Sequence, residues 1–166
     1  MRKYVDCDGV IFDSEFWLFD DEYRRLKIQD EFNKIKYIQA RDWYEILTKS
    51  EVISDAINIL KEMREVAILT KVHSMENEGV AKIKFLRELG VRNEIILAPF
   101  TVKKTDVVNP FGNILVDDTV HNLDDWKEKG GIPIFFNKDN LDVDGWGRTN
   151  TDYPKIKSLD YLKKIS

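Results

Sequence analysis

Two aspartates, Asp6 and Asp8, follow a short apolar run that begins almost at the N-terminus. Alternate side chains of a strand point the same way, so both carboxylates could face one site, with Gly9 supplying the turn. Two close carboxylates repel each other, and a site that holds them usually also holds a cation or a proton. Aspartate and glycine also form ordinary turns, so a solvated turn is the alternative for the pair taken alone.

Three further pairs of polar residues lie at or just after the end of an apolar run. Side chains at the carboxyl ends of parallel strands meet at one edge of a sheet, where α/β proteins bind their ligands. A second pair of carboxylates far along the chain therefore strengthens the interpretation of the first as part of a chemical site. Thr70 and the later aspartates could instead cap the helices that follow them. The three pairs are Thr70-Lys71, Lys103-Lys104 and Asp117-Asp118.

Five short apolar runs, rich in valine and isoleucine, predict buried strands. Near-continuous apolar runs are typical of a parallel sheet that is covered on both faces. Helical patterns separate the runs, and this alternation predicts an α/β fold with a doubly wound, Rossmann-like parallel sheet. The predicted strands are residues 3–7, 65–70, 94–98, 113–117 and 132–136.

Three helices are expected between these strands, because apolar residues recur at helical spacing. The second is expected to end at Gly90 and the third at Gly130-Gly131. The helical positions are Ile53, Ala56, Ile57 and Leu60, then Val80, Ile83, Leu86 and Leu89, and finally residues 120–129.

Residues 14–50 interrupt the alternation with a segment dense in aromatic and charged side chains. Mixed charges such as those of residues 20–25 suit an exposed helix. We predict that 14–50 is a small helical cap inserted after the first strand, and that residues 1–13 and 51–166 form the α/β core domain. Two ordinary helices packed on the sheet are the alternative. The aromatic residues are Phe16, Trp17, Phe19, Tyr23, Phe32, Tyr37, Trp43 and Tyr44.

The C-terminal part of the chain carries weaker patterns. Residues 153–159 predict a last short strand and then a helix capped by Ser158. Asp139, Asp142 and Asp144 lack the spacing and the terminal glutamate of a calcium loop, so they predict a plain surface loop.

The bulk properties fit one globular domain. The chain has 166 residues and a net charge of −4, which argues against affinity for nucleic-acid polymers or acidic membranes. No apolar stretch approaches the ~20 residues of a membrane span, and the N-terminus lacks a signal-peptide pattern. The single cysteine, Cys7, suits a reducing compartment. We expect a cytoplasmic protein whose oligomeric state is open, with a homodimer as one option.

Two isolated residues lie near the expected site. Cys7 stands between the two aspartates, and its side chain should point away from them into the core as an inert packed thiol. His73 follows Thr70 and is expected to be a loop residue without a role, although it could also contact a substrate.

The four polar groups resemble, in order and spacing, the four motifs of the haloacid dehalogenase-like (HAD) phosphohydrolases across nearly the whole chain. The first and last groups are specific as a pair. The resemblance implies that Asp6 is the nucleophile and forms an aspartyl-phosphate. Asp8 would protonate the leaving oxygen and then activate water. An aspartate at this second position is similar to the phosphatases of the superfamily rather than to its dehalogenases.

The resemblance also implies roles for the later motifs. Thr70, with Lys71 beside it, would hold the phosphoryl group. Lys104, or alternatively Lys103, would steady Asp6 and neutralise phosphoryl charge. Mg²⁺ prefers a few carboxylates together with phosphate oxygens and water. Its expected ligands are Asp6, Asp8, Asp117 and Asp118.

A finer resemblance is to the 5′(3′)-deoxyribonucleotidases, which combine an Asp-x-Asp-Gly-Val opening with a short helical cap. Ser14 stands where that family tends to place an aromatic residue. Phe16 and Trp17 lie close by, and such cap aromatics would stack on a pyrimidine. The matching residues are Asp8-Gly9-Val10, Asp13, Lys104-Thr105, Val116-Asp117-Asp118, Asn122, Trp126 and Gly130-Gly131.

The function implied by this resemblance is Mg²⁺-dependent hydrolysis of the phosphomonoester of a (deoxy)ribonucleoside monophosphate, as in a 5′-nucleotidase of deoxyribonucleotide catabolism. The expected partner is a small phosphate ester rather than a nucleic-acid polymer. Two alternatives stay open: a HAD phosphatase for another small phosphate ester, and a catalytically silent nucleotide-binding module of the same fold.

Overall fold

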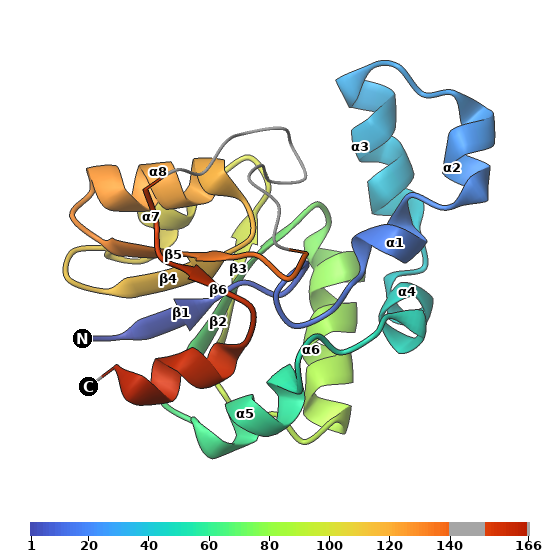
Figure 1. Cartoon of the computed structure of the whole chain (residues 1–166). Coiled ribbons are helices and arrows are strands. Elements are labelled where there is room, and N and C mark those ends of the chain that lie inside the picture. The colour runs from blue at the N-terminus through green and yellow to red at the C-terminus, as the bar shows by residue number, and fades with distance from the viewer. Residues whose placement is uncertain (140–151, 166) are drawn as a thin grey trace.

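The computed structural model describes residues 1–139 and 152–165, so the loop predicted around Asp142 and Asp144 lies outside the described residues. A six-stranded sheet is ordered β3-β2-β1-β4-β5-β6, and all neighbouring strands are parallel (Figure 1). The predicted doubly wound parallel sheet is confirmed. The strands are β1 (Lys3–Val5), β2 (Ala67–Val72), β3 (Ile95–Pro99), β4 (Ile114–Asp117), β5 (Ile132–Phe136) and β6 (Lys155–Ile156).

Helices cover both faces of the sheet (Figure 1). Helices occur where the patterns at 53–60, 80–89 and 120–129 predict them, and a 3₁₀ helix capped by Ser158 follows the last strand. The elements after residue 50 are α5 (Ala56–Glu62), the π-helical turn η1 (Met75–Gly79), α6 (Val80–Glu88), α7 (Lys104–Val107), α8 (Val120–Glu128) and the 3₁₀ helix η2 (Leu159–Lys164).

Successive strand residues point to opposite faces of the sheet. Val5 and Val116 belong to one buried cluster, which contains side chains of α5, α6 and η2. Tyr4 and Leu115 belong to a second cluster, which contains side chains of α8. Both faces are therefore buried, as the near-continuous apolar runs predict.

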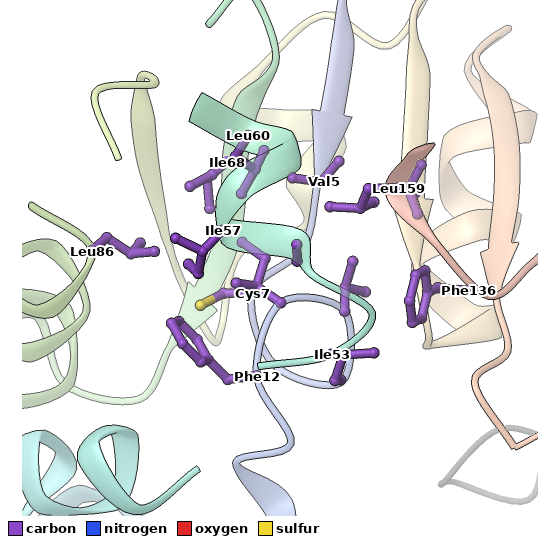
Figure 2. Close-up of a cluster of buried hydrophobic side chains, with 14 of the residues drawn as sticks. Val5, Cys7, Phe12, Ile53, Ile57, Leu60, Ile68, Leu86, Phe136 and Leu159 are labelled. Carbon is purple, nitrogen blue, oxygen red and sulfur yellow. The ribbon is translucent and has the colours of Figure 1, made fainter. Parts of the chain in front are cut away.

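Cys7 lies inside the first of these clusters, among Val5, Phe12 and Ile57 (Figure 2). Its side chain has no exposed surface. Burial, and after it the charge of Asp8, raises the pKa of the Cys7 thiol well above its usual value. The prediction of a packed thiol that points into the core is confirmed.

The α6 helix buries a different set of residues from the one that its apolar spacing suggests. Val80 is 55% exposed and Ile83 is 38% exposed, whereas Ala81, Lys82 and Leu86 are buried. A lysine can face the interior here because several oxygen atoms accept hydrogen bonds from its ammonium group and offset its desolvation.

Residues 15–49 form four short helices. Asp20, Asp30 and Asp42 begin three of them, and each carboxylate accepts a hydrogen bond from the backbone N–H three residues on. None of the helices in the described ranges is long and apolar enough to cross a membrane. The four helices are α1 (Glu15–Leu18), α2 (Asp21–Leu26), α3 (Glu31–Ala40) and α4 (Trp43–Lys49).

The four helices differ in their relation to the core. In Figure 1, α2 and α3 stand away from the sheet, and the described residues of α2 include none that is buried. Trp43 and Leu47 of α4 belong to the same buried cluster as Val5, and one residue each of α1 and α3, Leu18 and Ile38, reaches this cluster as well. α4 therefore packs with the core, although it lies within the segment predicted to be a cap.

Candidate active site

The chain leaves the sheet in a tight turn directly after β1. This strand ends two residues earlier than predicted, because the carbonyl of Cys7 accepts hydrogen bonds from the N–H groups of Ile11 and Phe12. Gly9 in the turn has a φ of +73°. A Cβ atom at Gly9 would lie 1.9 Å from Asp118 Oδ2. Glycine is required here both by the backbone and by the neighbouring carboxylate.

Three carboxylates converge beside this turn. An oxygen of each of Asp6, Asp117 and Asp118 lies within 4.8 Å of the other two. Asp6 follows β1 and Asp117 ends β4, the two neighbouring strands at which the strand order reverses. Burial, together with the charges of Asp117 and Asp8, raises the pKa of Asp6 to about 6 against the opposing charge of Lys104. Burial, and after it the charges of Asp117 and Asp6, raises the pKa of Asp118 well above its usual value.

This group of carboxylates fits a divalent cation. Carboxylates buried this close together repel one another and are stabilised by a cation between them. Carboxylate oxygens are also the protein ligands that Mg²⁺ prefers. Asp6, Asp117 and Asp118 could therefore hold Mg²⁺, whereas the carboxylate of Asp8, the fourth predicted ligand, is not a member of this group.

Lys104, the first residue of α7, reaches into the carboxylate group. Its Nζ atom lies 2.7 Å from Asp117 Oδ2 and 2.9 Å from Asp6 Oδ1. Burial alone would lower the pKa of Lys104, but the charges of Asp117 and Asp6 outweigh burial and raise it. Lys103 instead lies half exposed on the surface and pairs with Asp125 at 2.7 Å. Of the two lysines left open by the sequence, the structure places Lys104 in the site.

The first turn of α8 orients Asp117. Its Oδ1 accepts a hydrogen bond from the Thr119 N–H at 2.8 Å, and its Oδ2 accepts one from Asn122 Nδ2 at 3.0 Å. The N-cap residue of α8 is Thr119, whose side chain makes no capping hydrogen bond, so the capping alternative for Asp117 and Asp118 is not what the structure shows.

Asp8 is held by a different set of partners. Its Oδ1 accepts a hydrogen bond from Ser14 Oγ at 2.5 Å, and its Oδ2 lies 2.5 Å from Lys82 Nζ. The Asp8 side chain is 25% exposed and lines the cavity described below. Ser14, the departure from the deoxyribonucleotidase pattern, thus donates to the predicted proton carrier.

Lys82 is a site residue that the sequence analysis missed. Its side chain is fully buried, and its Nζ also contacts Glu78 Oε1 at 2.7 Å and Thr70 Oγ1 at 3.2 Å. Burial alone would lower the pKa of Lys82, but the charges of Asp8 and Glu78 outweigh burial and raise it. Thr70 is fully buried as well, so its hydroxyl lies against Lys82 rather than on the cavity wall.

A cavity of about 550 Å³ opens over these residues, between the sheet and helices α1, α3 and α4. Its sheet side carries the carboxylates and Lys71. Burial, and after it the charge of Lys104, lowers the pKa of Lys71. The helical side carries the apolar residues Leu18, Phe19, Ile38 and Trp43 together with the carboxylates of Glu15 and Glu31, and Phe100, which directly follows β3, adds an aromatic ring on the sheet side.

Phe19 and Trp43, two of the cap aromatics named in the sequence, line the cavity, but the two that were expected to stack on a base do not. Phe16 is 66% exposed and packs edge to face against Trp17, and neither lines the cavity. His73 does line it, and its ring stacks on that of Phe100 with centroids 5.1 Å apart. Of the two interpretations of His73, the structure places the residue where it could contact a ligand.

Comparisons with known proteins give fold relatives only. No family model and no curated protein matches the chain. A HAD hydrolase of Bacillus subtilis, YfnB, solved with magnesium bound, is 14% identical, with a TM-score of 0.63 and 99% of each chain covered. The D,D-heptose 1,7-bisphosphate phosphatase of Burkholderia thailandensis is 14% identical, with a TM-score of 0.55, over 98% of this chain and 99% of that one.

A third solved structure, a haloacid dehalogenase-like family hydrolase of Streptococcus pneumoniae, is 15% identical, with a TM-score of 0.59, over 99% of this chain and 98% of that one. Identities this low establish shared architecture and leave activity to be argued from the site. The chain has the fold of the HAD-like hydrolases.

Proposed function

We propose that this protein is a Mg²⁺-dependent phosphomonoesterase that works through an aspartyl-phosphate on Asp6. The observation that carries the proposal is the convergence of Asp6, Asp117, Asp118 and Lys104 at the carboxyl ends of β1 and β4. Phosphoryl transfer requires mainly positioning and charge neutralisation, and such a group of charged residues supplies both. A Mg²⁺ ion held by the three carboxylates would neutralise charge on the phosphoryl oxygens.

The reaction proceeds in two displacements at phosphorus. A carboxylate oxygen of Asp6 attacks the phosphorus atom, the bond to the ester oxygen breaks, and Asp8 gives that oxygen a proton. Water then attacks the phosphorus of the aspartyl-phosphate, Asp8 accepts a proton from it, and Asp6 is released with inorganic phosphate. Lys104 stays beside Asp6 and balances negative charge throughout, and Lys71 on the cavity wall faces the phosphate.

A nucleoside monophosphate is the substrate class that the cavity favours. Lys71 and a Mg²⁺ ion held by the carboxylates would suit the phosphate, and the aromatic lining residues Phe19, Trp43 and Phe100 suit a planar base. The volume of about 550 Å³ lies within the range of small-ligand sites. Another small phosphate ester with an apolar part is the competing substrate class.

The test is phosphate release with Mg²⁺ from a panel of deoxyribonucleotides, ribonucleotides, 3′-monophosphates and sugar phosphates. Asp6→Asn should abolish release, whereas Asp21→Asn, which changes an exposed carboxylate on α2, should not. Preference for deoxypyrimidine monophosphates would support the nucleotidase proposal. Preference for sugar phosphates would overturn the proposed nucleotide substrate but not the proposed aspartyl-phosphate reaction. Thermal stabilisation by nucleotides without phosphate release would favour a silent binding module.

A further inference from the structure

The buried ammonium group of Lys82 lies at the centre of a cluster of oxygen atoms. Its Nζ atom is 2.5 Å from Asp8 Oδ2, 2.7 Å from Glu78 Oε1 and 3.1 Å from the carbonyl oxygen of Lys71. It also lies 5.2 Å from the centre of the Trp43 ring. One side chain of α6 thus joins β2, the turn after β1 and α4.

Glu78 keeps this ammonium group in place. The Glu78 side chain is buried in the π-helical turn η1, and its Oε2 accepts a hydrogen bond from the His73 N–H at 2.6 Å. The same turn is tied to residues 39–41 by Asn77, whose Nδ2 donates to the carbonyl groups of Gln39 and Arg41. π-Helical turns inside longer helices are often found at functional sites.

The cluster contains one buried ion pair, Lys82 with Glu78, and one further carboxylate, that of Asp8. Lys82 and Glu78 are both fully buried and compensate each other, so the pair is balanced without any further anion. Asp8 is the additional carboxylate, and it alone of the three reaches partly into solvent. Lys82 does not line the cavity, so it cannot contact a substrate there directly.

We propose that Lys82, anchored by Glu78, is a positioning residue that holds the Asp8 carboxylate at the angle from which it reaches the leaving oxygen of the substrate. This inference rests on the proposed function, in which Asp8 carries the proton. Ser14 fixes one carboxylate oxygen and Lys82 fixes the other, which leaves the Asp8 side chain little freedom to rotate. A misplacement of about 1 Å can reduce a rate by about 10²-fold.

The distinguishing experiment compares two leaving groups. The p-nitrophenolate ion leaves p-nitrophenyl phosphate without needing a proton, whereas the alkoxide of glycerol phosphate or of a nucleotide needs one. The double variant Lys82→Met/Glu78→Gln removes the buried pair together, because Lys82→Met alone would leave the Glu78 carboxylate buried without its cation. Lys84→Met, an exposed lysine on the same helix, is the matched control.

The readout is the rate at which the first equivalent of alcohol or p-nitrophenolate is released at saturating Mg²⁺, a step that precedes the attack by water in which Asp8 also takes part. We expect the double variant to lose about 10²-fold with the alkyl ester and less than about threefold with p-nitrophenyl phosphate, at little change in KM. Lys84→Met should match the wild type with both. Circular dichroism and thermal unfolding check each fold, and Lys82→Gln/Glu78→Gln replaces the double variant if that one unfolds.

Two results would overturn the inference in distinguishable ways. Equal losses with both substrates, or no loss in a folded double variant, would show that Lys82 does not position Asp8 while the phosphatase proposal stands. A wild-type protein inactive toward both esters with Mg²⁺ would overturn the proposed function, and the positioning role with it.

Discussion

The absent side chain of Gly9 leaves the space into which Asp118 reaches. Gly9→Ala would add a Cβ atom 1.9 Å from Asp118 Oδ2 and would strain a residue at a φ of +73°. We expect Mg²⁺-dependent activity to fall by about 10²-fold or more, with a stability loss of about 1–3 kcal/mol. Activity assays and thermal unfolding measure the two effects.

Gly112→Ala is the matched control for that substitution. Gly112 also has a positive φ, of +68°, but nothing lies within 4 Å of a Cβ atom built there. It lies shortly before the first residue of β4, at the end of that strand opposite Asp117. This variant should lose about 1 kcal/mol of stability and keep its activity. Equal activity losses in the two variants would contradict the role given to the Gly9 turn.

Lys104 and Lys103 offer a second comparison between single residues. Lys104→Met leaves the buried Asp6 and Asp117 carboxylates without their ammonium partner, so we expect activity to fall by about 10²–10³-fold. Lys103→Met removes only a half-exposed ion pair with Asp125 and should leave activity unchanged. Steady-state phosphate release decides between them, and the opposite ranking would assign the motif lysine to Lys103.

Among the helices and strands, the sequence predicts where the strands end. It does not predict which face of a helix points toward the core. Apolar runs predict the sheet because a strand buried on both faces must be apolar throughout. Polar residues that directly follow such runs are then expected to share one site, because the carboxyl ends of parallel strands lie at the same edge of the sheet. Asp6, Asp8, Asp117 and Asp118 are predicted in this way, and so is the pair Lys103-Lys104, without a choice between the two lysines.

Lys82 was missed because a lysine in an amphipathic helix is normally read as exposed. One signal was present, since Glu78, Lys82 and Leu86 are four residues apart and share a helix face. Whether that face points inward depends on acceptors from Asp8 and Thr70, which are distant in the sequence. Tertiary contacts of this kind also decide which aromatic residues line the cavity.

The place of α4 in the core leads to a prediction for this element. Trp43 is 2% exposed within the main buried cluster, so Trp43→Ala should destabilise the protein by about 3–5 kcal/mol. Phe32 on α3 is 65% exposed, and Phe32→Ala should change stability by less than about 0.5 kcal/mol. Urea unfolding measures both. Equal effects, or a small effect of Trp43→Ala, would show that the Trp43 side chain does not contribute to the main buried cluster.

At the scale of the whole molecule, the buried carboxylates link stability to pH and to Mg²⁺. The pKa of Asp6 is raised from 3.8 to about 6, so the folded protein favours protonated Asp6 more than the unfolded chain does. The contribution of Asp6 to the free energy of unfolding is therefore present in full below about pH 4 and is lost as the pH rises through about 6. The shift corresponds to about 3 kcal/mol.

A cation between the carboxylates should reverse that loss. We expect Mg²⁺ to raise the unfolding temperature more at about pH 7.5 than at about pH 4.5, because protonated carboxylates bind it poorly. Sodium chloride at matched ionic strength controls for screening. An equal effect of Mg²⁺ at both pH values, or none at either, would count against the assigned metal ligands.

A phosphoryl group carried covalently by Asp6 can be detected by mass spectrometry of the protein quenched in acid during turnover. With Mg²⁺ and p-nitrophenyl phosphate, we expect one phosphoryl group on the peptide that contains Asp6. Occupancy should rise in Asp8→Asn, which slows attack by water, and vanish in Asp6→Asn. Phosphate release with no phosphorylated peptide, or with the phosphoryl group on another residue, would contradict the proposed role of Asp6.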